Sequence, residues 1–324
     1  MSESWTWVRE AILAGGLITT LIATLVLMTG SWPPMVVVES GSMMHEDNGN
    51  VGAIDPGDLV LVMSPEKKTV VTFAEAVQSG NSAEGYEAHG MAGDVIIYAK
   101  NGGSTTPVIH RAILQAVAED TVTPIDRNSE NPCDGTAGSW DPISIDEDGN
   151  AGTCVLTWTV PGTDVFDVEE ITVTIDYTCK NGSSLQITDW DPGHAGYLTT
   201  GDNVVTNGCN VDQYAAIGYS GNHFAPRQGL IDEETGLPVT AVRDDWIVGV
   251  AGGEIPWVGA VKLGLSNNSD QVPNASWTKL MFTAIILLAI PAIWERVANK
   301  ALATAPEVDQ ARIEAIMPPL QEEE

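Results

Sequence analysis

The sequence predicts a mainly β protein, in which an antiparallel β domain lies between two membrane-spanning helices and carries an inserted acidic β subdomain. Three observations lead to this fold class: an apolar segment near each end, short Val- and Ile-rich runs between them, and an unusually acidic stretch. The expected parts are an anchor at 1–30, a β domain at 31–118 and 195–276, the insertion at 119–194, a second span at 277–298 and an acidic tail at 299–324.

The first apolar segment, Ala11–Thr29, lies in a stretch without charge between Glu10 and Glu39. About 20 apolar residues cross a bilayer, and tryptophans flank this segment at both ends, as interfacial aromatics do. A cleaved signal peptide is the alternative. The preceding residues are not a basic region and no A-x-A site follows, so the pattern favours an uncleaved anchor.

The second apolar segment, Leu280–Trp294, is shorter and contains Pro291, which spanning helices tolerate. A buried or interfacial helix is the alternative here. Arg9 precedes the first span and Arg296 follows the second, whereas no Lys or Arg follows the first span until Lys67. The positive-inside rule therefore predicts a cell-membrane protein with two spans, cytoplasmic termini and an extracytoplasmic β domain.

Short runs rich in β-branched residues, bounded by Gly, Pro and Asp, predict the strands of an antiparallel sandwich or barrel-like domain. They lie at 59–63, 95–99, 108–117, 154–160, 171–178 and 246–251. One short helix is predicted at Thr69–Gln78. The insertion holds many carboxylates against only Arg127 and Lys180, which predicts a small solvated subdomain rather than part of the main core.

The chain has four cysteines, Cys133, Cys154, Cys179 and Cys209. An even number in an extracytoplasmic domain predicts two disulfides, and the sequence leaves all three pairings open. The alternatives are a zinc site, for which no C-x-x-C pair exists, and buried free thiols.

Composition restricts the function. With 44 acidic against 14 basic residues, the formal net charge is −30, while 44% of residues are hydrophobic. That apolar content excludes a disordered acidic chain, and the charge argues against a nucleic-acid partner. The excess charge predicts a halophilic protein, because molar salt shortens the Debye length to about 3 Å. An acidic protein that works in dilute salt is the alternative.

Three segments carry groups suited to nucleophilic catalysis: the SGSM sequence at Ser40–Met43, the strand with His110, and the GDN turn with Asp202, followed by Asp212. A serine nucleophile requires a base to take its proton and an acid to orient that base. A histidine with a pKa near 6.5 needs little tuning for this role. None of the three segments indicates catalysis by itself, but together they supply the nucleophile, the base and the orienting acid.

In order and topology these segments resemble the type I signal peptidases, specifically the branch found in archaea and the endoplasmic reticulum. The resemblance covers about residues 1–118 and 195–298, and the acidity suggests a haloarchaeal member. It implies that Ser42 is the nucleophile, that His110 stands where bacterial enzymes have a lysine, and that Asp212, or else Asp202, orients it.

The same resemblance assigns the oxyanion-binding and substrate-binding roles. They fall to the hydroxyl of Ser40, the backbone N–H of Ser42 and the neighbouring Met43. The chain departs from the family in having His45 where a proline often stands, and in a spacing of ten residues between the two aspartates.

Other histidines and lysines are alternatives to His110 as the general base. His45 is the alternative histidine, and the remaining three, His89, His194 and His223, are predicted at the surface. A lysine base would be one of Lys67, Lys68 and Lys100, all predicted to be solvated.

The implied function is a membrane-bound serine endopeptidase that cleaves N-terminal signal peptides from exported preproteins, with small residues at the −1 and −3 positions. Expected partners are signal peptides, the lipid bilayer and the protein translocon. No cofactor and no metal are expected, since no spacing such as H-E-x-x-H occurs. The alternatives are a non-catalytic, membrane-tethered β binding module and a related peptidase that processes other surface-protein precursors.

Overall fold

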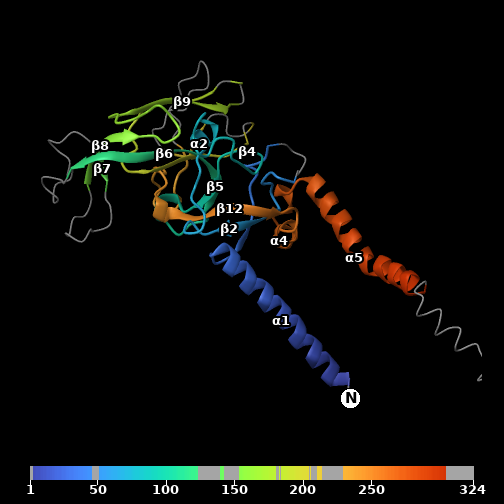
Figure 1. The fold of residues 1–324 in the computed structure, drawn as a ribbon. Coiled ribbons are helices and arrows are strands. Elements are labelled where there is room, and N and C mark those ends of the chain that lie inside the picture. The colour runs from blue at the N-terminus through green and yellow to red at the C-terminus, as the bar shows by residue number, and fades with distance from the viewer. Residues whose placement is uncertain are drawn as a thin grey trace, which may run out of the picture. The chain divides into compact units, whose positions relative to one another are not determined.

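The chain forms a mainly antiparallel β domain, with a long apolar helix toward each end of the sequence (Figure 1). The computed structural model describes residues 3–45, 51–122, 139–141, 153–179, 182, 184–203, 205, 210–213 and 229–303. Two units are distinguished, Met1–Pro273 with the β domain and Asn274–Glu324 with the second long helix.

The main sheet has eight strands in the order β1–β2–β12–β5–β6–β8–β7, with β11 also paired to β6. Their bounds are β1 Met35–Val37, β2 Leu59–Met63, β5 Val95–Tyr98, β6 Val108–Val122, β7 Ser139–Asp141, β8 Thr153–Thr159, β11 Gly196–Thr200 and β12 Ile247–Ile255. Two small antiparallel pairs complete the strands: β3 Glu87–Ala88 with β4 Met91–Ala92, and β9 Ile171–Thr178 with β10 Ser184–Trp190. The six predicted strands are present, whereas β1, β3, β4, β7, β10 and β11 were not predicted.

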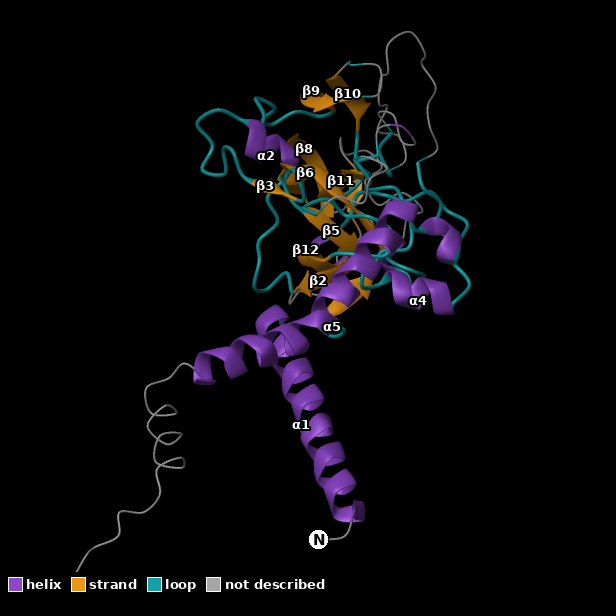
Figure 2. Ribbon diagram, turned by 90° about the vertical axis from the view of Figure 1, so that its right-hand side faces the viewer, coloured by secondary structure: helices purple, strands orange, loops and turns teal. Residues whose placement is uncertain are grey.

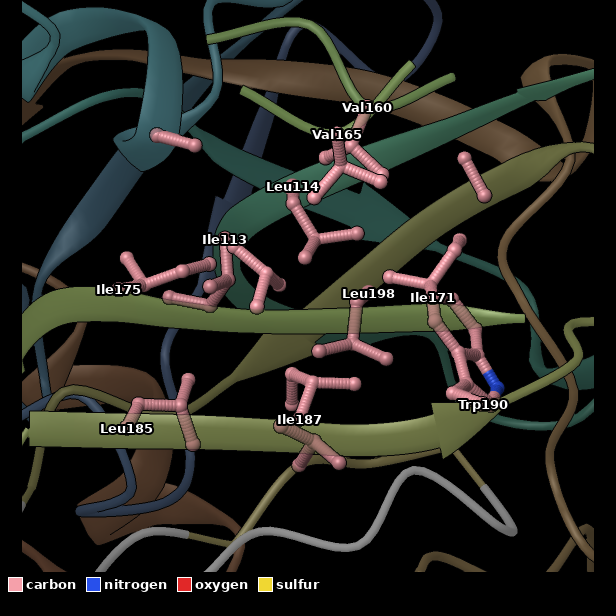
Figure 3. Packing of buried hydrophobic residues seen from close by; sticks show 14 of the residues in the cluster. Ile113, Leu114, Val160, Val165, Ile171, Ile175, Leu185, Ile187, Trp190 and Leu198 are labelled. Carbon is pink, nitrogen blue, oxygen red and sulfur yellow. The ribbon is translucent and has the colours of Figure 1, made fainter. Parts of the chain in front are cut away.

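Strand β6 joins the expected insertion to the rest of the domain. Its first residues pair with β5, its later residues pair with β8, and β11 pairs with it at residues 111–116. Apolar side chains from β6, β8 and β11 and from β9 and β10 form one cluster (Figure 3). Among them are Ile113, Leu198, Ile171 and Trp190, each at most 1% exposed. The prediction of a solvated subdomain outside the main core is therefore wrong for the described part of 119–194.

The strand alternation explains why the acidic stretch can share this core. In β9, residues alternate strictly between buried and exposed, so the apolar side chains face inward and the polar ones face solvent. Tyr177 of β9 is buried and donates a hydrogen bond to the carbonyl of Gly201 at 3.3 Å. The insertion thus contacts the turn that carries Asp202.

Helix α2 spans Phe73–Val77, shorter than the predicted Thr69–Gln78, because a capping box fixes its start. The Thr72 hydroxyl accepts from the N–H of Glu75 at 3.2 Å, and the Glu75 carboxylate accepts from the N–H of Thr72 at 2.9 Å. The helix packs on β6 (Figure 2). Phe73 meets Tyr177 edge to face, with ring centroids 5.4 Å apart.

Helix α1, Glu3–Thr29, is long and apolar enough to cross a membrane, and none of its apolar window is buried. The backbone N–H of Ser64 donates to the Thr29 carbonyl at 2.9 Å, and Lys67 Nζ donates to the Leu27 carbonyl at 2.5 Å. Lys67 therefore satisfies a free carbonyl at the helix end, a role that the prediction of a solvated lysine missed.

Helix α5, Asn274–Ala303, extends well beyond the predicted Leu280–Trp294 and also meets the length and apolarity of a membrane span. Pro291 lies inside it. None of the residues in its apolar stretch is buried. The tail beyond 303 lies outside the described residues.

Cys154 and Cys179 are buried and disulfide-bonded, so the alternative of buried free thiols is wrong for these two. Cys133 and Cys209 lie outside the described residues, and the pairing stays open.

Substituting Trp158→Ala should lower the free energy of unfolding by about 3–5 kcal/mol, because the large side chain is 1% exposed within the shared cluster. Denaturant unfolding in detergent would measure this change. The control is Phe166→Ala: the Phe166 side chain is 62% exposed, so its loss should change the free energy of unfolding little. Separate unfolding of the insertion, with the main sheet unaffected, would contradict a shared core.

Candidate active site

The segment after β1 forms a tight turn that presents Ser42. The N–H of Met44 donates to the Gly41 carbonyl at 3.2 Å and closes the turn. A Cβ on Gly41 would lie 2.9 Å from Met44 Sδ, so glycine fits here without displacing that side chain. Met43 is 1% exposed and packs in an apolar cluster with Val38 and other residues, which anchors the turn to the domain.

His110 is placed by the pairing of β6 with β5. It lies directly opposite Ile96, so the two side chains share a face of the sheet. The next residue of β6, Arg111, points to the opposite face. His110 is only 6% exposed.

The structure brings Ser42, His110 and Asp212 together. His110 Nε2 is 2.9 Å from Ser42 Oγ, and His110 Nδ1 is 2.6 Å from Asp212 Oδ2. With Nδ1–H donating to the carboxylate, Nε2 is left as the acceptor for the serine hydroxyl. This is the arrangement that a serine nucleophile, a general base and an orienting acid require.

Asp212 is held by more than the histidine. Its Oδ2 also accepts from the Tyr98 hydroxyl at 2.9 Å and from the Thr199 hydroxyl at 2.6 Å. The backbone N–H of Asp212 donates to the Thr199 carbonyl at 2.9 Å, and Gln213 Nε2 donates to the Thr199 hydroxyl at 3.0 Å. All of these groups are buried, so the carboxylate has a fixed position relative to the imidazole.

This environment shifts the pKa values of His110 and Tyr98. Burial by itself would lower the pKa of His110, but the charge and hydrogen bond of Asp212 outweigh it, and the pKa is raised above 6.5. Burial and the Asp212 charge raise the pKa of Tyr98 well above 10, so its hydroxyl remains a donor.

Asp202 occupies a different site, on the other side of β6. It accepts from Arg111 Nε at 2.8 Å and lies 3.1 Å from His45 Nε2. Burial would raise the pKa of Asp202, but Arg111 and the His45 hydrogen bond lower it. Of the two predicted aspartates, Asp212 is the one hydrogen-bonded to His110, and His45 is bonded to Asp202.

The remaining predicted residue of the turn, Ser40, has its hydroxyl 3.2 Å from that of Ser42. Sequence reasoning missed Asn203, whose N–H donates to the Ser42 carbonyl, and the supporting residues Tyr98 and Thr199. A signal existed for all three, because Asn203 belongs to the GDN turn, Thr199 lies just before that turn, and Tyr98 lies in the predicted strand at 95–99.

The lysines and the other histidines depart from their predictions. Lys100 has a side chain 8% exposed and pairs with Glu233, and Lys68 is half-buried and pairs with Asp94 at 2.8 Å, so neither is simply solvated. His194 is buried, and the side chain of His89 is 7% exposed and pairs with Glu254, so their predicted surface positions are wrong. His223 lies outside the described residues.

No family model and no curated protein matches the chain when its sequence is compared with them. Within the described residues, no group of three or more His, Cys, Asp or Glu side chains is arranged to hold a metal ion.

His110 should titrate above pH 6.5, and Asp212→Asn should lower its pKa further than Asp202→Asn, because only Asp212 bonds the imidazole. An NMR titration of the labelled histidines in detergent measures both. A larger shift with Asp202→Asn would contradict this assignment.

Proposed function

We propose that this protein is a membrane-anchored serine endopeptidase that removes signal peptides from exported preproteins. The observation that carries the proposal is the hydrogen-bonded series from Ser42 Oγ through His110 to Asp212, at 2.9 and 2.6 Å. A non-catalytic binding module has no need for these three groups, from distant parts of the chain, to converge.

In the proposed reaction, Ser42 Oγ attacks the scissile carbonyl carbon while its proton passes to His110 Nε2. The carbonyl oxygen becomes an oxyanion, for which the Ser42 N–H and the Ser40 hydroxyl are the candidate donors. Collapse breaks the C–N bond, and His110 returns the proton to the departing amine. Water then repeats the sequence on the acyl-enzyme and releases the carboxylate product.

The substrate class follows from the resemblance and from what surrounds the nucleophile. The apolar cluster that holds Met43 includes Val38 and Val95, with Val36 and Ile109 only partly buried against it. Such a surface suits small apolar residues at −1 and −3. Helix α1 ends at Thr29, shortly before Ser42, so an anchored α1 would keep the nucleophile near the bilayer. Anchoring raises the effective concentration of enzyme and substrate on one surface.

The topology proposed with this function has both termini in the cytoplasm and the β domain outside, beside the translocon that delivers preproteins. A related peptidase acting on other surface-protein precursors would use the same three groups, and substrate assays separate the two.

Cleavage of a preprotein with an A-x-A site, in high salt and detergent, should fall at least about 10⁴-fold in Ser42→Ala and in His110→Ala. The exposed Ser82→Ala is the control, expected to cleave at the wild-type rate. Normal cleavage by Ser42→Ala would overturn the proposal, and activity only on other precursors would redirect it to the related peptidase.

The net charge of −30 predicts that the melting temperature rises when KCl is increased from about 0.2 M to about 3 M, because salt screens the self-repulsion. A neutral sugar at matched osmolarity is the control, since it changes hydration without screening. A melting temperature that does not respond to KCl would contradict the halophilic interpretation.

A further inference from the structure

Asn203 contacts the nucleophile turn at two successive carbonyls. Its backbone N–H donates to the Ser42 carbonyl at 2.9 Å, and its side-chain Nδ2 donates to the Gly41 carbonyl at 2.7 Å. Its Oδ1 accepts from the N–H of Val205 at 3.2 Å, which fixes the orientation of the amide. The nitrogen, not the oxygen, therefore faces Gly41.

The hydrogen bond to the Gly41 carbonyl also orients the N–H of Ser42. The Gly41 carbonyl and the Ser42 N–H belong to the same planar trans peptide, so they point in opposite directions. Fixing the carbonyl fixes the direction of the N–H. The N–H of Met44 also donates to this carbonyl, but at 3.2 Å, so Asn203 makes the shorter of the two bonds. A hydrogen bond to the carbonyl also polarises the amide and strengthens its N–H as a donor.

The position of Asn203 is itself fixed by buried neighbours. The preceding residue, Asp202, is 3% exposed and bonded by Arg111, which is fully buried. Arg111 Nη1 donates further to the carbonyls of Ala88 and Gly93 at 3.1 and 2.6 Å. Because Arg111 follows His110 on β6, one strand sets the position of both the base and the turn that carries Asn203.

We propose that Asn203 is a positioning residue for the oxyanion donor, holding the Gly41–Ser42 peptide so that the Ser42 N–H faces the oxygen that becomes negative. This inference rests on the proposed function. It assigns the GDN turn two separate tasks: Asp202 fixes the turn, and Asn203 aligns the nucleophile segment.

This role predicts that stabilisation is lost only for species that carry an oxyanion. In Asn203→Ala and Asn203→Asp, kcat should fall about 10- to 100-fold while KM changes less than about twofold, since one oxyanion donor is worth about 10²–10³ in rate and here it is only misaligned. Asn203→Asp keeps an acceptor for Val205 and removes the donor to Gly41 but adds a negative charge, so Asn203→Ala shows the loss of the donor without that charge. Rates are taken on the pH plateau, so a shifted pKa of His110 does not enter.

The control is Asn101→Asp. Asn101 also donates from its side-chain amide to a backbone carbonyl, that of Pro238 at 3.0 Å, and accepts from a backbone N–H through its Oδ1. The same bond is lost there without involving the nucleophile turn, so kcat should stay within about twofold of the wild type.

The decisive readout compares two inhibitors of the same peptide sequence. In a peptide aldehyde, Ser42 Oγ bonds to the carbonyl carbon while its proton passes to His110 Nε2, the C=O double bond becomes a C–O single bond, and the oxygen takes the oxyanion position. In the other inhibitor a CH₂–NH group replaces the scissile amide, so no oxyanion forms. The inhibition constant for the aldehyde should rise in the Asn203 variants by the factor lost in kcat, and the second should stay constant.

Each outcome decides between the two claims. Inhibition constants are independent of the fraction of protein that is folded, so partial misfolding does not mimic the effect. An unchanged ratio of the two constants, with an active wild type, overturns the role of Asn203 and leaves the proposed function standing. A wild type that does not cleave preproteins overturns the proposed function and this inference with it.

Discussion

The buried carboxylate of Asp212 is the constraint on which the site depends. An isolated charge in an apolar interior is costly, and it is retained only where donors surround it. Here a single oxygen accepts from His110 of β6, Tyr98 of β5 and Thr199 of β11. These donors come from three strands paired side by side, so compensating the carboxylate requires the register of β5, β6 and β11 to be the one observed.

Strand β6 extends this constraint to both faces of the sheet. His110 engages Asp212 on one face, and the next residue, Arg111, engages Asp202 on the other, as the alternation of a strand requires. The two aspartates therefore have different contacts: Asp212 is hydrogen-bonded to His110, and Asp202 is bonded by Arg111 and holds the turn that reaches Ser42. The later residues of β6 pair with β8 and carry the apolar cluster shared with β9, so the acidic insertion supports the same strand from its far end.

Much of this was open to prediction because strong local patterns encode it. The two apolar helices and six strands follow from runs of apolar and β-branched residues, and the three site segments from their motifs. The sequence could not separate Asp202 from Asp212, because the choice depends on which face of β6 each meets. It also did not show that β9, in the acidic stretch, buries its alternate residues in the main core, nor that Lys100 is buried against Glu233. Those outcomes depend on tertiary contacts between residues distant in the chain.

The central claim is that Ser42 and His110 act as one chemical unit, and a double-mutant cycle on preprotein cleavage tests it most directly. The residual rates of Ser42→Ala, His110→Ala and the double variant are compared over long incubations. If the two residues act as one unit, the double variant should be no slower than either single variant, because losing one partner already disables the other. Losses that multiply in the double variant would show two independent contributions and contradict the account.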